Sequence, residues 1–339
     1  MPHMLMKDES GMDAIAWAGK TPWHSLGQEM SDLMSSQEAL VNARLDWQVR
    51  LEQNFVNIDG EFVEVPNTFS TVRNQQEGDD SIILSKNGKT VTSRYTPWQN
   101  VEALSFLDDL VNTGEAVIEV AGALDEGQRI WVLARLPSYI KVANTDNVMN
   151  YVLISNNHDG TGSIRIQPTM IRVVCNNTLT MALGSDKNRF VMRHTANVNN
   201  RVDEARKILG LVNIRLGEWS ASAEEMLKVK MTIDEMKEYW EDSMGLKRNE
   251  LGELSTRAEN IIKEIEACRT HETNMVGDMD MTAWQAYNAL TYYIDHINTL
   301  DNLGFQDNNK VTSALMGNNS ERKVKAWELA EEMMMEVSK

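Results

Sequence analysis

The chain has 339 residues, a formal net charge of -17 and 42% apolar residues. This length exceeds the roughly 100–200 residues of a usual single domain, and the apolar content is enough for a folded core, so we expect two domains. No apolar run approaches the roughly 20 residues that cross a bilayer, and we expect no membrane partner. The two cysteines, Cys175 and Cys268, form no CxxC pair, and no signal sequence opens the chain. We therefore expect the cytoplasm of a host cell as its location.

The charge is distributed unevenly along the chain. Residues 161–210 contain eight basic and three acidic residues, a local charge of +5. Residues 231–339 contain 11 basic and 21 acidic residues, a local charge of -10. A strongly acidic chain is a poor general coat for nucleic acid, because neutralising phosphates requires clustered cations. The cationic middle segment is therefore the part that needs an explanation.

The first third of the chain predicts mixed helix and strand. After a flexible tail over residues 1–12, the apolar spacing of residues 35–47 predicts a helix that begins at a Ser36 cap. The pattern then changes to period two, and Asp59-Gly60 predicts the turn of a long hairpin. A second strand pair is expected within residues 81–95, turned by Asn87 and Gly88.

Residues 96–114 predict another helix, with Thr96 as its cap and Pro97 in its first turn. Two strands follow at residues 116–124 and 129–137, joined by the short turn DEGQ. A further hairpin is expected around the sequence NHDGTG, because Asp159-Gly160 is a turn-forming pair.

The second half of the chain predicts mostly helix. We interpret residues 169–183 as a helix, although their β-branched content leaves a strand open. From about Asn197 onward, amphipathic patterns predict a series of helices, one of which begins with a capping box at Thr232. We expect an α+β fold, with an antiparallel sheet and helices in an N-terminal domain of residues 13–200. An all-helical region of residues 201–339 follows.

The sequence contains no recognisable catalytic constellation. The six histidines form no HxH, HExxH or HxxxH pattern, so we expect no metal and no cofactor. His24 lies in a Pro-Trp turn, His158 lies at a hairpin tip, and Cys175 has no adjacent histidine. A packed, non-catalytic role is favoured for each of the three. We therefore expect a protein that is not an enzyme, while an unfamiliar site that uses His24 or His158 stays open.

The cations of the middle segment have two interpretations. Arg165 alternates with Ile164 and Ile166 as on a strand, and it is followed by Arg172, Lys187, Arg189 and Arg193. Together with the amide-rich residues between them, these cations could follow a phosphate backbone. Alternatively, they pair with the surplus of carboxylates elsewhere in the chain. The sequence leaves both interpretations open.

Several stretches carry a resemblance to a known family. They are GKTPWHSLG, RYTPWQNVEALSFLDDLV, YVLISNNHDGTGSIRIQPTMIRVVCNNTLTMAL, TAWQAYNALTYYIDH and SALMG, and they lie within residues 11–330. They resemble an uncharacterised protein family of phages and plasmids, described as a domain of unknown function. This resemblance implies an origin in mobile genetic elements and an intracellular setting, and it supplies no assigned reaction.

A second resemblance concerns the fold of residues 36–73. Their order of helix, Trp47, strand, Asp59-Gly60 turn and strand is similar to the core of the single-strand annealing recombinases. Those proteins assemble into rings and hold single-stranded DNA along a cationic groove. The resemblance implies Arg50 and Arg73 as the cations of the hairpin that contact DNA, although a shared fold alone does not fix a function.

We therefore expect a non-catalytic nucleic-acid-binding protein of phage or plasmid recombination that anneals single strands. Its expected partners are single-stranded DNA and further copies of itself, in a homo-oligomer that includes the ring as one form. The expected contact residues are Arg50, Arg73, Arg165, Arg172, Lys187, Arg189 and Arg193. The alternative is an interaction protein that blocks or recruits a host factor through its acidic helices.

Overall fold

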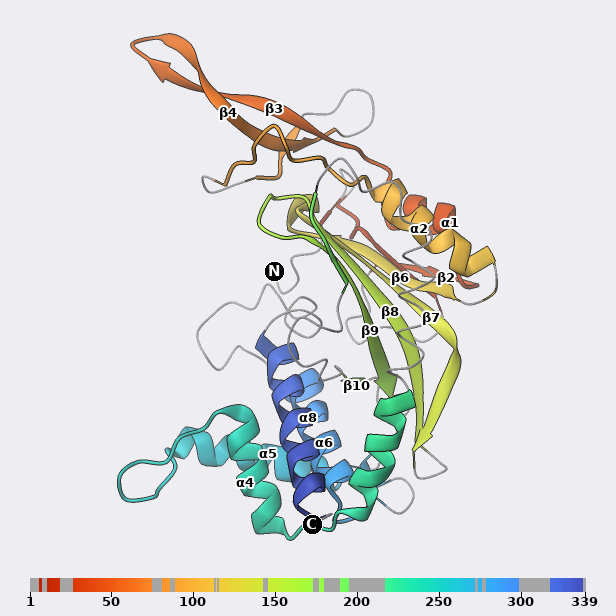
Figure 1. The fold of residues 1–339 in the computed structure, drawn as a ribbon, viewed down its shortest axis with the longest axis vertical. Helices are drawn as coiled ribbons and strands as arrows, with labels where there is room; N and C mark the ends of the chain where they lie inside the picture. Colours follow the sequence, from red (N-terminus) through yellow and green to blue (C-terminus); the bar gives the residue numbers. More distant parts are fainter. Residues whose placement is uncertain are drawn as a thin grey trace.

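A computed structural model gives the fold of the chain (Figure 1). It describes residues 6–7, 11–18, 27–74, 81–85, 89–112, 114, 116–142, 146–172, 177–179, 190–194, 217–271, 274–275, 279–298 and 318–337. The molecule is elongated, with a large sheet in its middle, a long hairpin at one end and a group of helices at the other. The α+β class expected from the sequence is confirmed.

The large sheet has eight strands, and its order is β10-β9-β8-β7-β6-β1-β2, with β11 paired to the free part of β9. Its strands are β1 (Ile15–Ala18), β2 (Gln28–Met30), β6 (Val117–Leu124), β7 (Arg129–Val142), β8 (Asp146–Asn157), β9 (Ile164–Arg172), β10 (Asn177–Leu179) and β11 (Phe190–Met192). All pairings are antiparallel except β1 with β2, which is parallel. The predicted strands at 116–124 and 129–137 and the hairpin around NHDGTG are confirmed as β6 to β9.

Two helices cover one face of this sheet, as Figure 1 shows: α1 (Ser36–Asn42) and α2 (Asn100–Asn112). The main apolar cluster joins them to inward side chains such as Ile118 and Val132. The opposite face carries a smaller buried cluster of Ile15, Leu124, Trp131, Leu133, Tyr151 and Leu153. The alternation of side chains along each strand therefore supplies both faces with apolar groups.

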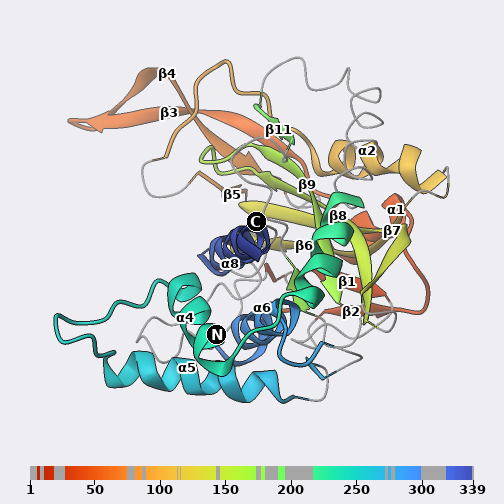
Figure 2. The same ribbon diagram turned by 60° about the horizontal axis from the view of Figure 1, so that its bottom comes forward.

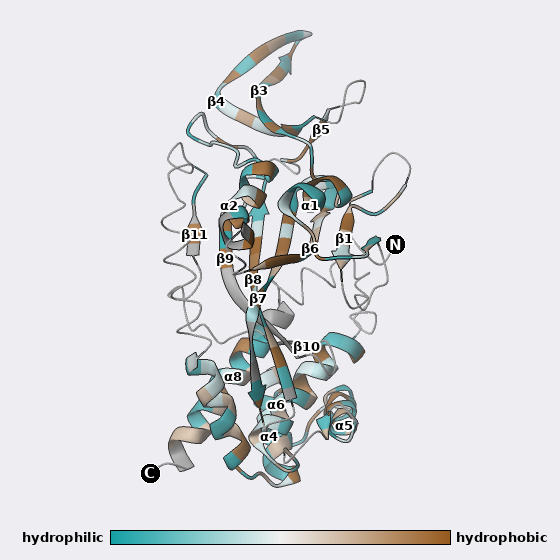
Figure 3. Cartoon of the chain, turned by 90° about the vertical axis from the view of Figure 1, so that its right-hand side faces the viewer, coloured by the Kyte–Doolittle hydropathy of each residue, from teal (hydrophilic) through white to brown (hydrophobic). Residues whose placement is uncertain are grey.

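The long hairpin forms a separate three-stranded sheet of β3 (Val49–Ile58), β4 (Glu61–Arg73) and β5 (Ile82–Ile83). Its turn is the predicted Asp59-Gly60 pair, with φ angles of 51° and 95° that match a type I′ turn. We call this hairpin the arm, because it extends away from the body of the molecule (Figures 1 and 3).

The helical end is formed by residues 217–228, α4 (Ile233–Met244), α5 (Thr256–Arg269), α6 (Ala283–Tyr292) and α8 (Asn318–Val337). Figure 2 shows these helices grouped beside one another. The predicted capping box at Thr232 is confirmed, because its hydroxyl accepts from the N–H of Glu235. Trp219 stacks on Trp327 and meets the edge of Trp284, and all three belong to the same apolar cluster as the sheet. The main apolar cluster thus continues from the sheet into the helical end.

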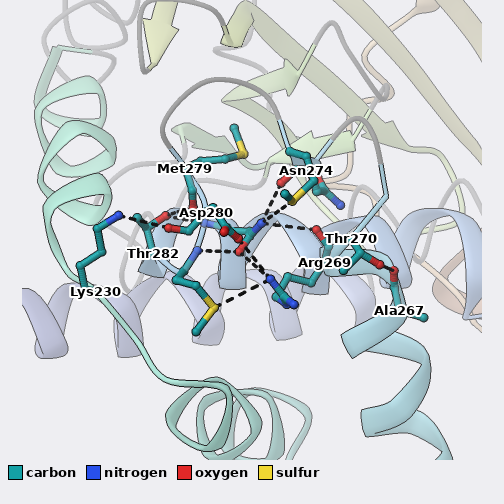
Figure 4. A network of polar contacts seen from close by, with 11 residues as sticks. Lys230, Ala267, Arg269, Thr270, Asn274, Met279, Asp280 and Thr282 are labelled. Atoms are coloured by element: carbon teal, nitrogen blue, oxygen red, sulfur yellow. Dashed lines mark hydrogen bonds and ion pairs between the residues drawn. The ribbon is translucent and has the colours of Figure 1, made fainter.

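A polar network fixes the loop that leads from α5 into α6 (Figure 4). Gln285 is fully buried at its centre. Its Oε1 accepts from the N–H of Met281 at 2.9 Å, and its Nε2 donates to the carbonyl of Asn274 at 3.1 Å. Arg269 forms an ion pair with Asp280 at 3.2 Å beside it. One buried amide therefore holds backbone groups from both sides of the loop.

Four local predictions were wrong. The capping residue of α1 is Ser35, which forms a capping box with Glu38, because Ser36 is turned inward and donates to the carbonyl of Leu104. Helix α2 begins at Asn100, four residues after Thr96.

The other two errors concern strands. Residues 82–83 and Val91 both pair with β4 instead of with each other across residues 87 and 88, which lie outside the described residues. The helix predicted over residues 169–183 is strand wherever it is described, in β9 and β10. Its β-branched residues follow the pairing offered by β8, so the sheet overrides the helical spacing.

Candidate functional site

The arm joins the large sheet through a buried polar group of residues that we call the polar joint: Trp47, Arg73, Asn100, Asn156 and His158. The guanidinium carbon of Arg73 lies 5.5 Å from the centre of the Trp47 ring, and the His158 ring meets Trp47 edge-on at 5.4 Å. Gly127, with a φ of 96°, packs against Trp47 and Arg73 so closely that a β-carbon would lie about 3 Å from both. The joint is therefore tightly packed.

His158 is fully buried and held by hydrogen bonds. Its Nε2 lies 2.8 Å from Oδ1 of Asn100, whose Nδ2 donates to the carbonyl of Leu45 at 2.9 Å. The histidine therefore donates through Nε2, since the amide oxygen can only accept. Burial, with the nearby His194, lowers the pKa of His158 to about 3, so the ring is neutral near pH 7. This geometry is that of a packed structural histidine.

The turn that follows His158 contains a second buried group. Asp159 accepts from the N–H and the hydroxyl of Thr161 at 3.0 and 2.6 Å, and its other oxygen pairs with Lys89 at 3.3 Å. Although burial raises the pKa of Asp159, these bonds lower it below its ordinary value. Next to it, His194 stacks on Tyr95 with ring centres 4.6 Å apart. The NHDGTG motif thus builds a closed, hydrogen-bonded turn.

The cations predicted for the arm differ in their surroundings. Arg73 is 2% exposed and belongs to the polar joint, so it is not placed to reach a phosphate backbone. Arg50 is partly exposed at the base of the arm, but it pairs with Glu52 and donates to the hydroxyl of Ser81 at 3.1 Å. The structure does not bring these two arginines together into a groove.

Of the cations predicted for the middle segment, those that the structure describes fall at the two ends of β9. Arg165 lies opposite Val191 of β11, and Arg193, two residues after Val191, directly follows the end of β11. Residues that pair across two neighbouring strands share a face, so Arg165 and Val191 lie on one side of the sheet, with Arg193 just beyond the strand. We call these three residues the cationic edge. Arg172 lies seven residues further along β9, roughly 23 Å away.

Several predicted residues lie outside the described residues. They are His24, Cys175, Lys187 and Arg189. The second cysteine, Cys268, is described, and it is buried and forms no disulfide. Burial raises the pKa of its thiol to about 12, which makes it unreactive near neutral pH.

An exposed aromatic ring beside a cation was missed by the sequence analysis. Tyr139, near the end of β7, is 53% exposed, and the ammonium of Lys141 lies 5.7 Å from the centre of its ring. Tyr139 lies opposite Met149, on the face that carries the smaller apolar cluster. The alternation of Tyr139 and Lys141 in SYIKV is the signal that could have identified this pair, which we call the aromatic–cation pair.

Among the described residues, no group of three or more His, Cys, Asp or Glu side chains is arranged to hold a metal ion. None of the helices in the described ranges is long and apolar enough to cross a membrane.

Residues 89–327, more than half of the chain, match the family described as a domain of unknown function, DUF932. The chain belongs to the DUF932 family. The DUF932 match includes the aromatic–cation pair, the cationic edge and most of the helical end, whereas the arm precedes it. The resemblance to a domain-of-unknown-function family is thereby confirmed. No curated protein and no solved structure matches the chain.

Proposed function

We propose that this DUF932 protein binds single-stranded nucleic acid without catalysing a reaction, in the recombination of a phage or plasmid. The observation that carries the proposal is the aromatic–cation pair, with Tyr139 exposed and the Lys141 ammonium 5.7 Å from its ring. Proteins that hold single strands stack bases on exposed aromatic rings and neutralise the backbone with nearby cations. Every base has a stacking face, so such a site needs no particular sequence.

The position of the pair supports this reading. Both residues lie near the end of the β7–β8 hairpin, where single-stranded nucleic acid can approach from solvent. Strand β7 contains no acidic residue, and the one acidic residue of β8 is Asp146 at its first position. We therefore assign base stacking to Tyr139 and a phosphate contact to Lys141.

The test is fluorescence anisotropy of a labelled single-stranded oligonucleotide at about 50 mM salt, where the electrostatic contribution is strong. Tyr139→Ala should weaken binding about 10-fold, because it removes one stacked base. Lys141→Ala should lower the slope of log affinity against log salt by about 0.7, the value for one phosphate contact on a single strand. Lys263→Ala, which removes an exposed cation from α5, is the matched control and should change neither quantity.

Annealing is tested separately, by mixing complementary labelled strands with and without the protein. Wild-type protein should accelerate pairing, and Tyr139→Ala should lose that effect. The proposal fails if wild-type protein binds no single strand at about 50 mM salt, or if the control loses as much affinity as the two variants. A protein that binds no DNA would return attention to the acidic helices and a protein partner.

A further inference from the structure

The tip of the arm, residues 55–64, is exposed to solvent. Its side chains are a mixture of apolar and acidic groups. All ten residues are exposed, and Phe62 is the most exposed of its apolar side chains at 76%. Phe55, Val56, Ile58 and Val63 are also exposed, at 43% to 55%. The same ten residues include Asp59, Glu61 and Glu64 and no basic residue. Figure 3 shows apolar and polar positions interspersed along both strands.

Both faces of the tip carry these apolar groups. Val56 pairs directly with Val63, while Phe55 and Phe62 lie on the opposite face, because they pair with Glu64 and Asn57. An isolated two-stranded hairpin is only marginally stable in water, and apolar side chains on both faces gain stability only when something covers them. The tip therefore has the composition of a docking element.

Side-chain hydrogen bonds at the middle of the arm hold it in position. The pairing shifts between Gln53 and Phe55, where four residues of β4 bulge out. The amide of Gln53 closes this bulge, because its Nε2 donates to the carbonyls of Val65 and Thr68 at 2.7 and 3.2 Å. Asn67 in the bulge accepts from the N–H and hydroxyl of Ser93 at 3.0 and 2.8 Å. These bonds fix the direction in which the tip projects.

The charge of the tip specifies the partner. Three carboxylates repel nucleic acid, so the aromatic groups of the tip are not a second stacking site. The complementary surface is an exposed apolar group flanked by cations. Part of the cationic edge has this character, since Val191 is 43% exposed and the exposed Arg193 lies two residues after it. Within one molecule the exposed tip makes no such contact.

We propose that the tip of the arm docks on the cationic edge of a second copy of the chain. On one face the tip presents Phe55 and Phe62 beside the carboxylate of Glu64, and the edge presents Val191 beside the exposed Arg193. Because the two surfaces are different, the contact is head-to-tail, and each copy both gives a tip and accepts one. Repetition builds a ring where the rotation closes and a filament where it does not.

The inference is tested without nucleic acid, by sedimentation velocity over a concentration series up to about 100 μM. High concentrations are needed because an interface formed by a ten-residue tip is small and therefore weak. Wild-type protein should self-associate, and about 0.5 M salt should weaken the association, because the contact pairs opposite charges. Phe62→Ser removes the tip contact, and Arg193→Glu removes the edge contact. Each variant alone should be monomeric, with self-association weakened at least about 10-fold. Both positions are exposed, and thermal melting checks that each variant is folded.

The decisive measurement mixes the two variants. Phe62→Ser retains an intact edge and Arg193→Glu retains an intact tip, so the mixture should form a dimer and nothing larger. A tip-to-tip contact would instead leave Arg193→Glu associated and give no dimer in the mixture. A wild-type chain that stays monomeric at about 100 μM would also overturn the proposal and leave a different protein as the partner. Loss of DNA binding by Tyr139→Ala does not affect these results, so this inference and the proposed function fail separately.

Discussion

His158 and His194 make the folded state sensitive to acid. Burial lowers the pKa of His158 to about 3 and that of His194 to about 4, from the ordinary value of 6.5. The unfolded chain takes up protons near pH 6.5 that the folded chain does not, so it binds more protons in this range. The free energy of unfolding therefore falls as the pH drops from about 6.5 toward 4, by at most about 1.4 kcal/mol per pH unit for each histidine.

Replacing His194 by phenylalanine isolates one of these two contributions. His194→Phe keeps a flat ring against Tyr95 and removes the titrating group. Urea unfolding at about pH 7.5, 6 and 5 should show a shallower loss of stability for the variant, by about 1 kcal/mol per pH unit between the last two values. The stabilities at about pH 7.5, where both rings are neutral, give the baseline for the comparison. Parallel pH profiles would contradict a buried, neutral His194.

Arg73 shows why residue-level roles were hard to predict. In the sequence it ends a strand of alternating residues and reads as a surface cation. In the structure it lies over Trp47, which is 26 residues away along the chain and is brought to it by the pairing of Val49 with Arg73. The prediction that His158 is a packed residue is based on the turn sequence around it, and its burial agrees with that prediction. Turns are encoded locally, whereas a partner across a sheet is not.

At the scale of one element, Gln285 is expected to anchor the start of α6. Gln285→Leu keeps the volume but leaves the N–H of Met281 and the carbonyl of Asn274 without their buried partner. The variant should lose about 1–3 kcal/mol of unfolding free energy, measured by chemical denaturation. Thr270→Val, an exposed change in the same network, is the control and should alter stability by less than about 0.5 kcal/mol. Equal losses of unfolding free energy from the two changes would show that the buried Gln285 amide is no more important to stability than an exposed residue of the network.

Elements with local signals were predicted well. The Asp59-Gly60 turn fixes the register of the arm, and the box of Thr232 with Glu235 fixes the start of α4. The segment 169–183 was misread because its apolar residues fit a helix as well as a strand. Only the neighbouring strand β8 decides between them, and its pairing with β9 is a long-range property. The aromatic–cation pair was missed for a related reason, since its exposure depends on where the sheet ends.

At the scale of the whole molecule, the sequence predicts a boundary near residue 200. Limited proteolysis should therefore cut first between about residues 195 and 235. The two pieces should nevertheless stay together on gel filtration, because side chains of the sheet and of the helical end share one apolar cluster. Separation of the pieces under native conditions would mean that this shared core contributes little to stability.

The change of period along the chain predicts the order of sheet and helices, and the structure agrees with it. The sequence could not predict that one core would run through both parts. That property depends on contacts such as Trp219 with Trp284 and Trp327, which join segments far apart along the chain. The sequence also could not predict that the arm would project from the body of the molecule. The residue pattern of a hairpin is the same whether the hairpin packs on the body or projects from it.

The position of β1 inside the large sheet has a consequence for synthesis. Ile15, Ala16 and Trp17 pair with β6 at Gly122, Ala121 and Val120, about a hundred residues later in the chain. A ribosome adds roughly 5–20 residues per second, so these apolar residues wait roughly 5–20 seconds for their partner to emerge. Sheets that depend on such distant pairing fold slowly, and their unpaired strands are prone to wrong contacts in the meantime. The nascent chain is therefore expected to be a client of chaperones that shield its first strand until β6 has been made.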